Sequence, residues 1–195
     1  MNLPNKITLS RIVLAFVFMF FLFCRGIAAK YLALFTFIAA SLTDLIDGRI
    51  ARRRKLENDF GRLMDPIADK ILILAAFLAF VEMEIIPAWM VIIIIFRELV
   101  ITGLRLNAAR HGKILAASLA GKHKTVSQMV SIITILVFLI VRESAKGFWS
   151  PILELWFKRG IFYLMLFTVA LTLISGLSYI IRNKNNLFAI NEKPD

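Results

Sequence analysis

The chain has 195 residues, of which 59% are hydrophobic, and its mean hydropathy is +0.79. This composition excludes an ordinary water-soluble domain, which has too little core to bury so much apolar side chain. The net charge of +11 would suggest nucleic-acid binding in a soluble protein, but here the basic residues lie between apolar segments. Membrane topology, anionic lipids and anionic substrates account for them better, so no nucleic-acid partner is expected.

Six apolar segments follow one another along the chain, and each approaches the roughly 20 residues that a helix needs to cross a bilayer. We therefore expect an all-α, polytopic membrane protein. Its six transmembrane helices form one catalytic domain over residues 1–182, followed by a polar tail over residues 183–195. No small-residue cleavage site follows the first segment, so we expect that segment to be retained. The predicted helices cover about residues 7–24, 31–52, 61–80, 87–107, 122–141 and 160–181.

The distribution of Lys and Arg predicts the orientation of these helices. If the N-terminus is cytoplasmic, only six of the 24 basic residues lie outside, and the other 18 lie inside or at inner helix ends. This asymmetry predicts that both termini are cytoplasmic and that the region from Asp44 to Asp69 lies at the inner face. Trp149 and Trp156 among charges suggest that residues 143–158 lie at the outer interface. The six outer basic residues are Arg25, Lys30, Arg142, Lys146, Lys158 and Arg159.

The most informative pattern is carried by four aspartates at the inner ends of the second and third predicted helices. It reads Asp-x2-Asp-Gly-x2-Ala-Arg-x8-Gly-x3-Asp-x3-Asp. At about 100° per residue, Asp44 and Asp47 are about 60° apart around one helix, and Asp65 and Asp69 are about 40° apart around the next. The tight connection makes the helices antiparallel, so all four carboxylates can face one space.

Four carboxylates in one space repel each other and therefore need cations. Hard divalent cations match oxygen ligands, and two Mg²⁺ or Mn²⁺ ions would balance the four charges and suit phosphoryl chemistry. Gly48 and Ala51 leave a smooth surface that a nucleotide base or sugar can approach. In the simpler alternative, the aspartates only pair with neighbouring arginines, but four carboxylates interleaved with Gly and Ala favour a functional site. Those arginines are Arg49, Arg52, Arg53, Arg54 and Arg62.

This pattern resembles the signature of the CDP-alcohol phosphatidyltransferase family. The similarity covers nearly the whole chain, and the six-helix count agrees. Looser matches over residues 2–11, 64–70, 97–105 and 121–125 resemble a bacterial branch of the family. Members of that branch join CDP-diacylglycerol to sn-glycerol 3-phosphate and release phosphatidylglycerophosphate and CMP. The eight matching signature positions are Asp44, Asp47, Gly48, Ala51, Arg52, Gly61, Asp65 and Asp69.

The resemblance implies a multi-pass enzyme of the bacterial inner (cytoplasmic) membrane that forms a homodimer. It implies that Asp44, Asp47, Asp65 and Asp69 line a two-metal site and that Asp69 is also the general base. Asn5, Thr8 and Arg11 precede or begin the first helix, and their simpler interpretation is helix capping and interface anchoring. The resemblance implies CDP-binding roles for Asn5, Thr8, Arg11, Asp44, Gly48, Ala51, Arg52 and Gly61.

An acceptor that carries a phosphate brings close to two negative charges into the interface and needs a cationic pocket. Arg97 and Arg105 are eight residues apart and lie on roughly the same side of one helix. Arg97 lies deepest, and its simpler interpretation is an ion pair with Glu98 or another acidic residue. For Lys122 and Lys124, the simpler interpretation is that they only set the orientation of the helices in the membrane. The candidate acceptor-phosphate residues are Lys70, Arg97, Arg105, Arg110, Lys122 and Lys124.

Three other functions remain open at this point. A sibling enzyme could use inositol phosphate, serine or a lipid as acceptor, although the basic residues after the fourth helix favour a phosphorylated one. A divalent-cation transporter would place its aspartates near the bilayer midplane, not at the inner helix ends predicted here. A prenyltransferase with aspartate-rich metal sites does not account for the Gly and Ala spacing.

Overall fold

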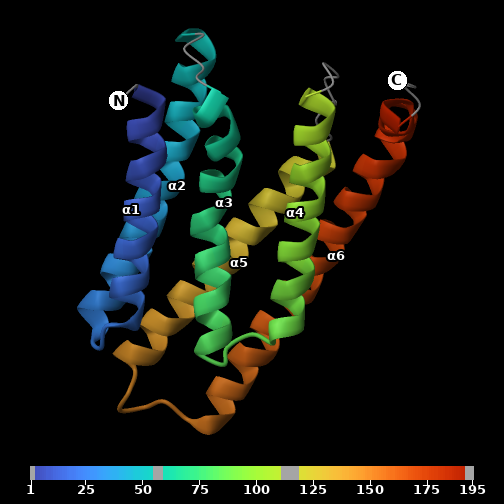
Figure 1. The fold of residues 1–195 in the computed structure, drawn as a ribbon. Coiled ribbons are helices and arrows are strands. Elements are labelled where there is room, and N and C mark those ends of the chain that lie inside the picture. The colour runs from blue at the N-terminus through green and yellow to red at the C-terminus, as the bar shows by residue number, and fades with distance from the viewer. Residues whose placement is uncertain (1–2, 55–58, 111–118, 192–195) are drawn as a thin grey trace. The chain divides into compact units, whose positions relative to one another are not determined.

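The computed structural model describes the backbone of residues 3–54, 59–110 and 119–191, and the side chains of residues 10, 12–43, 70–108, 121 and 123–184. The described chain forms six α-helices and no strand, which confirms the all-α prediction (Figure 1). The helices are α1 (Leu3–Phe23), α2 (Ile27–Arg54), α3 (Asp59–Glu82), α4 (Ala88–Arg110), α5 (Leu119–Ser144) and α6 (Pro151–Asn191).

Each predicted segment coincides with one helix, but α6 is much longer than its apolar part. It begins at Pro151 and continues to Asn191, whereas hydropathy predicted only residues 160–181. The backbone N–H of Leu153 donates to the Ser150 hydroxyl oxygen over 3.2 Å, and Pro151 occupies the first helical position. A serine cap followed by proline is a strong helix start. The end of the connection predicted at the outer interface is therefore helical, and the polar segment from residue 183 begins inside α6.

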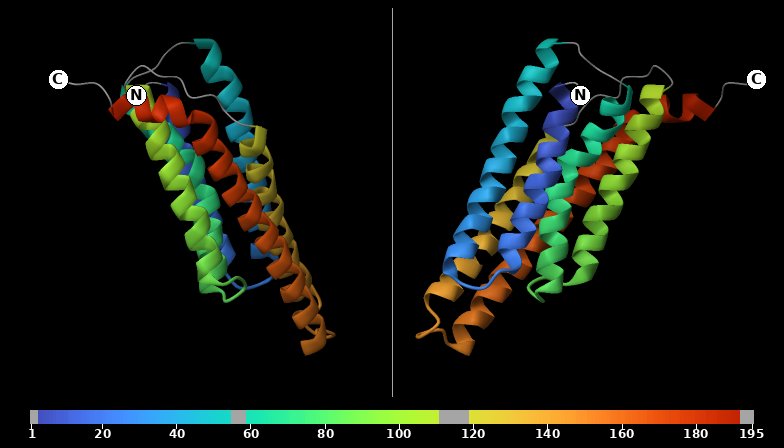
Figure 2. Two further views of the ribbon diagram at one scale, coloured as in Figure 1. Left: turned by 90° about the vertical axis from the view of Figure 1, so that its right-hand side faces the viewer. Right: turned by 60° about the vertical axis from the view of Figure 1, so that its left-hand side comes forward.

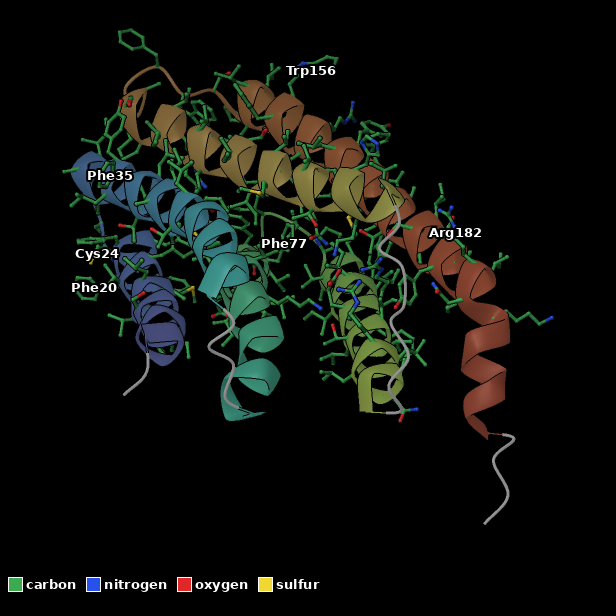
Figure 3. The ribbon with its side chains drawn as sticks, turned by 90° about the horizontal axis from the view of Figure 1, so that it is seen from above. Phe20, Cys24, Phe35, Phe77, Trp156 and Arg182 are labelled. Carbon is green, nitrogen blue, oxygen red and sulfur yellow. The ribbon has the colours of Figure 1, made fainter. Side chains whose placement is uncertain are left out.

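Two helical stretches are long and apolar enough to cross a membrane, judged on the part of the chain whose side chains are described. They are residues 123–144 and 151–184. Large apolar side chains also lie on the surface, and Phe16 and Phe35 are each 71% exposed. Figure 3 marks Phe20, Phe35 and Trp156, all of which are exposed. Such a surface is what a bilayer solvates well and water does not, and it is consistent with a membrane protein.

The chain divides into two compact units. Unit 1 comprises residues 1–85 and 132–159, and unit 2 comprises residues 86–131 and 160–195. In unit 1, α1 packs against both α2 and α3, and the right-hand view of Figure 2 shows α1 between them. Phe18 of α1 and Phe37 of α2 are fully buried, with ring centroids 5.7 Å apart. These contacts hold α1, α2 and α3 together.

The α1–α2 connection turns the chain back on itself. Gly26 has φ of +98°, a left-handed conformation that glycine adopts without strain. The Lys30 ammonium donates to the backbone carbonyl of Cys24 over 2.9 Å and to that of Leu22, so it satisfies free carbonyls at the end of α1. The N-terminal end of α1 and the C-terminal end of α2 therefore lie at the same end of unit 1 (Figure 1).

Unit 2 contains α4, the start of α5 up to Ser131, and α6 from Gly160 onward. Apolar residues at helical spacing supply part of its core, including Met90, Ile94 and Ile101 of α4. Unusually for apolar helices, unit 2 also buries many polar side chains. They are Glu98, Lys124, Ser127, Gln128, Ser131, Thr168, Thr172, Ser175 and Asn183.

Candidate active site

The four aspartates lie on two helix ends at the same end of unit 1 (Figure 1). Asp44 and Asp47 are in the C-terminal part of α2, and Asp65 and Asp69 are in the N-terminal part of α3. Both stretches are helical, so the angular relations predicted within each pair hold for the backbone. The four side chains lie outside the described residues, and their metal-binding role stays a prediction.

Other predicted site residues share this end of unit 1. The N-terminal part of α1 carries Asn5, Thr8 and Arg11, and it lies at the same end as the aspartate-bearing parts of α2 and α3 (Figure 1). Gly48, Ala51 and Arg52 lie on α2 and Gly61 lies on α3, but none of these seven side chains is described. Lys70 of α3 is half-buried. Among the side chains that are described, no three His, Cys, Asp or Glu residues form a group able to hold a metal ion.

A buried charged cluster in unit 2 consists of Arg97 and Glu98 of α4 and Lys124 of α5. Nη1 of Arg97 lies 3.2 Å from Oε1 of Glu98, and the Lys124 ammonium donates to the same carboxylate oxygen. Glu98 is 4% exposed and Lys124 is 5% exposed. Two cations share one carboxylate, so the cluster carries a formal net charge of +1. The ion pair suggested as the simpler reading of Arg97 is present.

Arg97 also reaches α6. Its Nη2 donates to the hydroxyl oxygen of Ser175 over 2.6 Å. The Nε–H of Arg97 is buried and has no hydrogen-bond partner within the described structure. A buried N–H without an acceptor is energetically costly.

Polar residues continue along the facing sides of α5 and α6 in unit 2. The hydroxyls of Ser131 and Thr168 are 2.9 Å apart, and Thr172 donates to the backbone carbonyl of Thr168 over 2.7 Å. The Gln128 amide nitrogen and the Tyr179 hydroxyl are buried without partners among the described residues. This arrangement makes a polar seam within otherwise apolar helices.

The other predicted acceptor residues have different settings. Arg105 of α4 is exposed, and its guanidinium carbon lies 5.7 Å from the ring centroid of Tyr179 on α6, in a cation–π arrangement. Arg110 is the last residue of α4 and Lys122 lies near the start of α5, but their side chains are outside the described part of the chain.

Sequence reasoning missed the residues that surround the cationic side chains. It considered Glu98 only as a partner of Arg97, and it did not select Gln128 or Ser175. A usable signal was the spacing of polar residues within apolar helices. Steps of three or four residues place such side chains on one helix face. The polar series are Lys124, Ser127, Gln128 and Ser131 on α5, and Thr168, Thr172, Ser175 and Tyr179 on α6.

Comparison with known proteins gives a consistent result. The model of the family described as CDP-alcohol phosphatidyltransferase matches residues 1–174. A Bacillus subtilis (strain 168) protein is 38% identical over 194 residues, which covers 93% of this chain and 95% of the relative. A Rickettsia felis protein is 32% identical over 185 residues, covering 91% and 93%. A Cereibacter sphaeroides protein is 35% identical over 135 residues, covering 67% and 61%. All three are named CDP-diacylglycerol–glycerol-3-phosphate 3-phosphatidyltransferase.

Proposed function

This chain belongs to the CDP-alcohol phosphatidyltransferase family, and we propose that it transfers a phosphatidyl group from CDP-diacylglycerol to sn-glycerol 3-phosphate. The products are phosphatidylglycerophosphate and CMP. The observation that carries this proposal is the 38% identity to the Bacillus subtilis enzyme over 93% of the chain. The unbroken aspartate signature supports it, because that region bears the chemistry of the family.

The family is generally dependent on divalent metal ions. The donor set fits such ions, since four carboxylates on two helix ends at the same end of unit 1 offer hard oxygen ligands. We propose that Asp44, Asp47, Asp65 and Asp69 hold two Mg²⁺ or Mn²⁺ ions. When bound, the ions supply charge neutralisation for the pyrophosphate and for the departing CMP.

The chain's own residues then orient the substrates and move one proton. A hydroxyl oxygen of glycerol 3-phosphate attacks the phosphorus attached to diacylglycerol. The bond from that phosphorus to the bridging oxygen breaks, and its electron pair leaves with CMP. Asp69 accepts the hydroxyl proton. We propose that the other CDP contacts come from Asn5, Thr8, Arg11, Asp44, Gly48, Ala51, Arg52 and Gly61.

The charged cluster is the proposed holder of the acceptor phosphate. Arg97 offers a planar fork for phosphate oxygens, and Lys124 adds a point charge. Their shared carboxylate, Glu98, offsets one of the two positive charges within the apolar helices. Lys70, Arg105, Arg110 and Lys122 are the remaining candidates for this role.

We further propose six membrane spans with both termini cytoplasmic, in the inner membrane of a bacterium. The shortest helix, α1, has 21 residues and is about 32 Å long at 1.5 Å per residue, enough to cross roughly 30 Å of hydrocarbon. The excess of Lys and Arg on one side supports the orientation. The proposed assembly, a homodimer, and the one-domain organisation rest on the family resemblance and the segment pattern.

The experiment that tests the proposed function measures CMP release from CDP-diacylglycerol by the purified protein. Glycerol 3-phosphate, glycerol, inositol phosphate and serine are each supplied as the acceptor. We expect release with glycerol 3-phosphate only. Release with another acceptor alone would identify a sibling enzyme, and no release with any acceptor would overturn the proposed function.

A further inference from the structure

The side chain of Arg97 lies against one short stretch of α6. A Cβ added at Gly176 would lie 3.1 Å from Cγ of Arg97 and 3.4 Å from its Nε. The preceding residue, Ser175, accepts the 2.6 Å hydrogen bond from Nη2 of Arg97. Gly176 therefore leaves space for the aliphatic part of the Arg97 side chain, while the Ser175 hydroxyl accepts a hydrogen bond from its guanidinium group.

The Gly176 and Ser175 contacts with Arg97 differ from those of comparable residues in these helices. A Cβ added at Gly103 of α4 or at Gly160 of α6 would meet no atom within 4 Å among the described residues, so only Gly176 of these three lies tightly against a neighbouring side chain. Thr172 donates its hydroxyl to a carbonyl of its own helix, as serines and threonines in apolar helices commonly do. The Ser175 hydroxyl oxygen instead accepts from a charged group on another helix.

The contacts leave one buried N–H of the guanidinium without an acceptor among the described residues. The Ser175 hydroxyl oxygen accepts a hydrogen bond from Nη2, and the Glu98 carboxylate accepts one from Nη1 over 3.2 Å. The buried Nε–H has no acceptor among the described residues. A guanidinium fixed on two sides can present its remaining donors in a set direction without losing further rotamer entropy on binding.

We propose that Ser175 and Gly176 are positioning residues for Arg97, and that they preset its guanidinium to receive a phosphate oxygen of a phosphomonoester acceptor. This inference rests on the proposed function, because it takes glycerol 3-phosphate as that acceptor. It assigns α6 a role in acceptor affinity through two residues that are not themselves cationic.

The test compares Ser175→Ala and Gly176→Ala with Gly160→Ala, the same glycine change at an open position of the same helix. The KM for glycerol 3-phosphate, the KM for CDP-diacylglycerol and kcat are measured on monodisperse, detergent-purified protein. We expect Ser175→Ala to raise the KM for glycerol 3-phosphate on the order of tenfold, as for loss of a hydrogen bond to a charged group. Gly176→Ala should raise this KM about fivefold, because the aliphatic part of Arg97 must shift by a few tenths of an ångström and displaces the guanidinium with it. Both variants should leave the KM for CDP-diacylglycerol within about twofold, and Gly160→Ala should change neither constant.

A double-mutant cycle separates positioning from general damage to folding. Arg97→Ala leaves Glu98 paired with Lys124, so it creates no uncompensated buried carboxylate. In that background, Ser175→Ala should change the KM for glycerol 3-phosphate by less than about twofold, because the two residues act through one contact. Ser175→Thr, which keeps the hydroxyl, should recover part of the affinity lost in Ser175→Ala. If Ser175→Ala does not purify as folded protein, Gly176→Ala and its cycle with Arg97→Ala decide the question.

Equal increases in both KM values, or additive effects in the cycle, would overturn the positioning role while the activity of the wild-type protein stood. A wild-type protein that releases no CMP with glycerol 3-phosphate would instead overturn the proposed function. The two failures are therefore distinct.

Discussion

Replacing Glu98 by glutamine should destabilise the protein strongly. The change keeps the size of the side chain but removes a carboxylate that the Arg97 and Lys124 side chains share in the described structure. Both partners are largely buried, with side-chain exposures of 11% and 7%, so water cannot replace the lost charge. Breaking a buried ion pair by removing one partner typically costs about 3–5 kcal/mol.

This cost translates into a measurable thermal shift. For a chain of this size, 1 kcal/mol corresponds to roughly 2–4 °C in Tm, so the expected decrease is on the order of 10 °C. The assay is thermal unfolding of detergent-purified protein. Glu154→Gln is the matched control, because Glu154 pairs with Lys158 and Arg142 at a partly exposed position, where ion pairs contribute little. Its Tm should change by a few degrees at most.

The same variant also tests the acceptor site. Without the carboxylate, Arg97 and Lys124 together carry a formal charge of +2, which complements a phosphate dianion. Glycerol 3-phosphate should therefore raise the Tm of Glu98→Gln by more than it raises that of the wild type. A Tm within about 2 °C of wild type would refute the stabilising role of Glu98. Absence of protection in both proteins would refute phosphate binding by these cations, and equal protection would refute the expectation that the Glu98 carboxylate weakens this binding.

Four further outcomes are expected. Exhaustive EDTA treatment should abolish CMP release, and Mg²⁺ or Mn²⁺ should restore it; full turnover without metal would exclude the two-metal mechanism. Asp69→Asn should lose turnover while largely retaining CDP-diacylglycerol binding, and CMP release at a near wild-type rate would show that Asp69 is not the base. Arg105→Ala should raise the KM for glycerol 3-phosphate tenfold to a hundredfold, as for loss of a charge-assisted contact of about 1.5–3 kcal/mol, with little change for CDP-diacylglycerol; equal shifts would remove Arg105 from the acceptor site. With Cys24 replaced, a cysteine in place of exposed Arg182 should resist membrane-impermeant thiol reagents in intact cells, whereas one in place of Phe148, which is 94% exposed, should react; the opposite pattern would reverse the topology.

Much of the fold could be predicted from the sequence because each helix corresponds to a local run of apolar residues. Apolar runs of helical length predicted six helices, and six are present in the described chain. The extent of α6 was underestimated, since hydropathy detects the apolar part of a helix and not the Ser150 cap and Pro151 start that lie before it. The aspartate pattern could be recognised in the sequence because each pair of aspartates lies within about one helical turn and a short connection joins the two helices.

The surroundings of the cations could not be predicted in the same way. The sequence alone suggested an Arg97–Glu98 pair only as the simpler alternative to substrate contact, and it singled out both Arg97 and Lys124 as candidate acceptor-phosphate residues. Only tertiary structure showed that Lys124 shares the same carboxylate, that Ser175 accepts from an arginine 78 residues earlier in the chain, and that Gly176 makes room for it. Helical periodicity specifies which residues share a face of one helix, whereas the contacts between faces of different helices depend on how whole side chains pack.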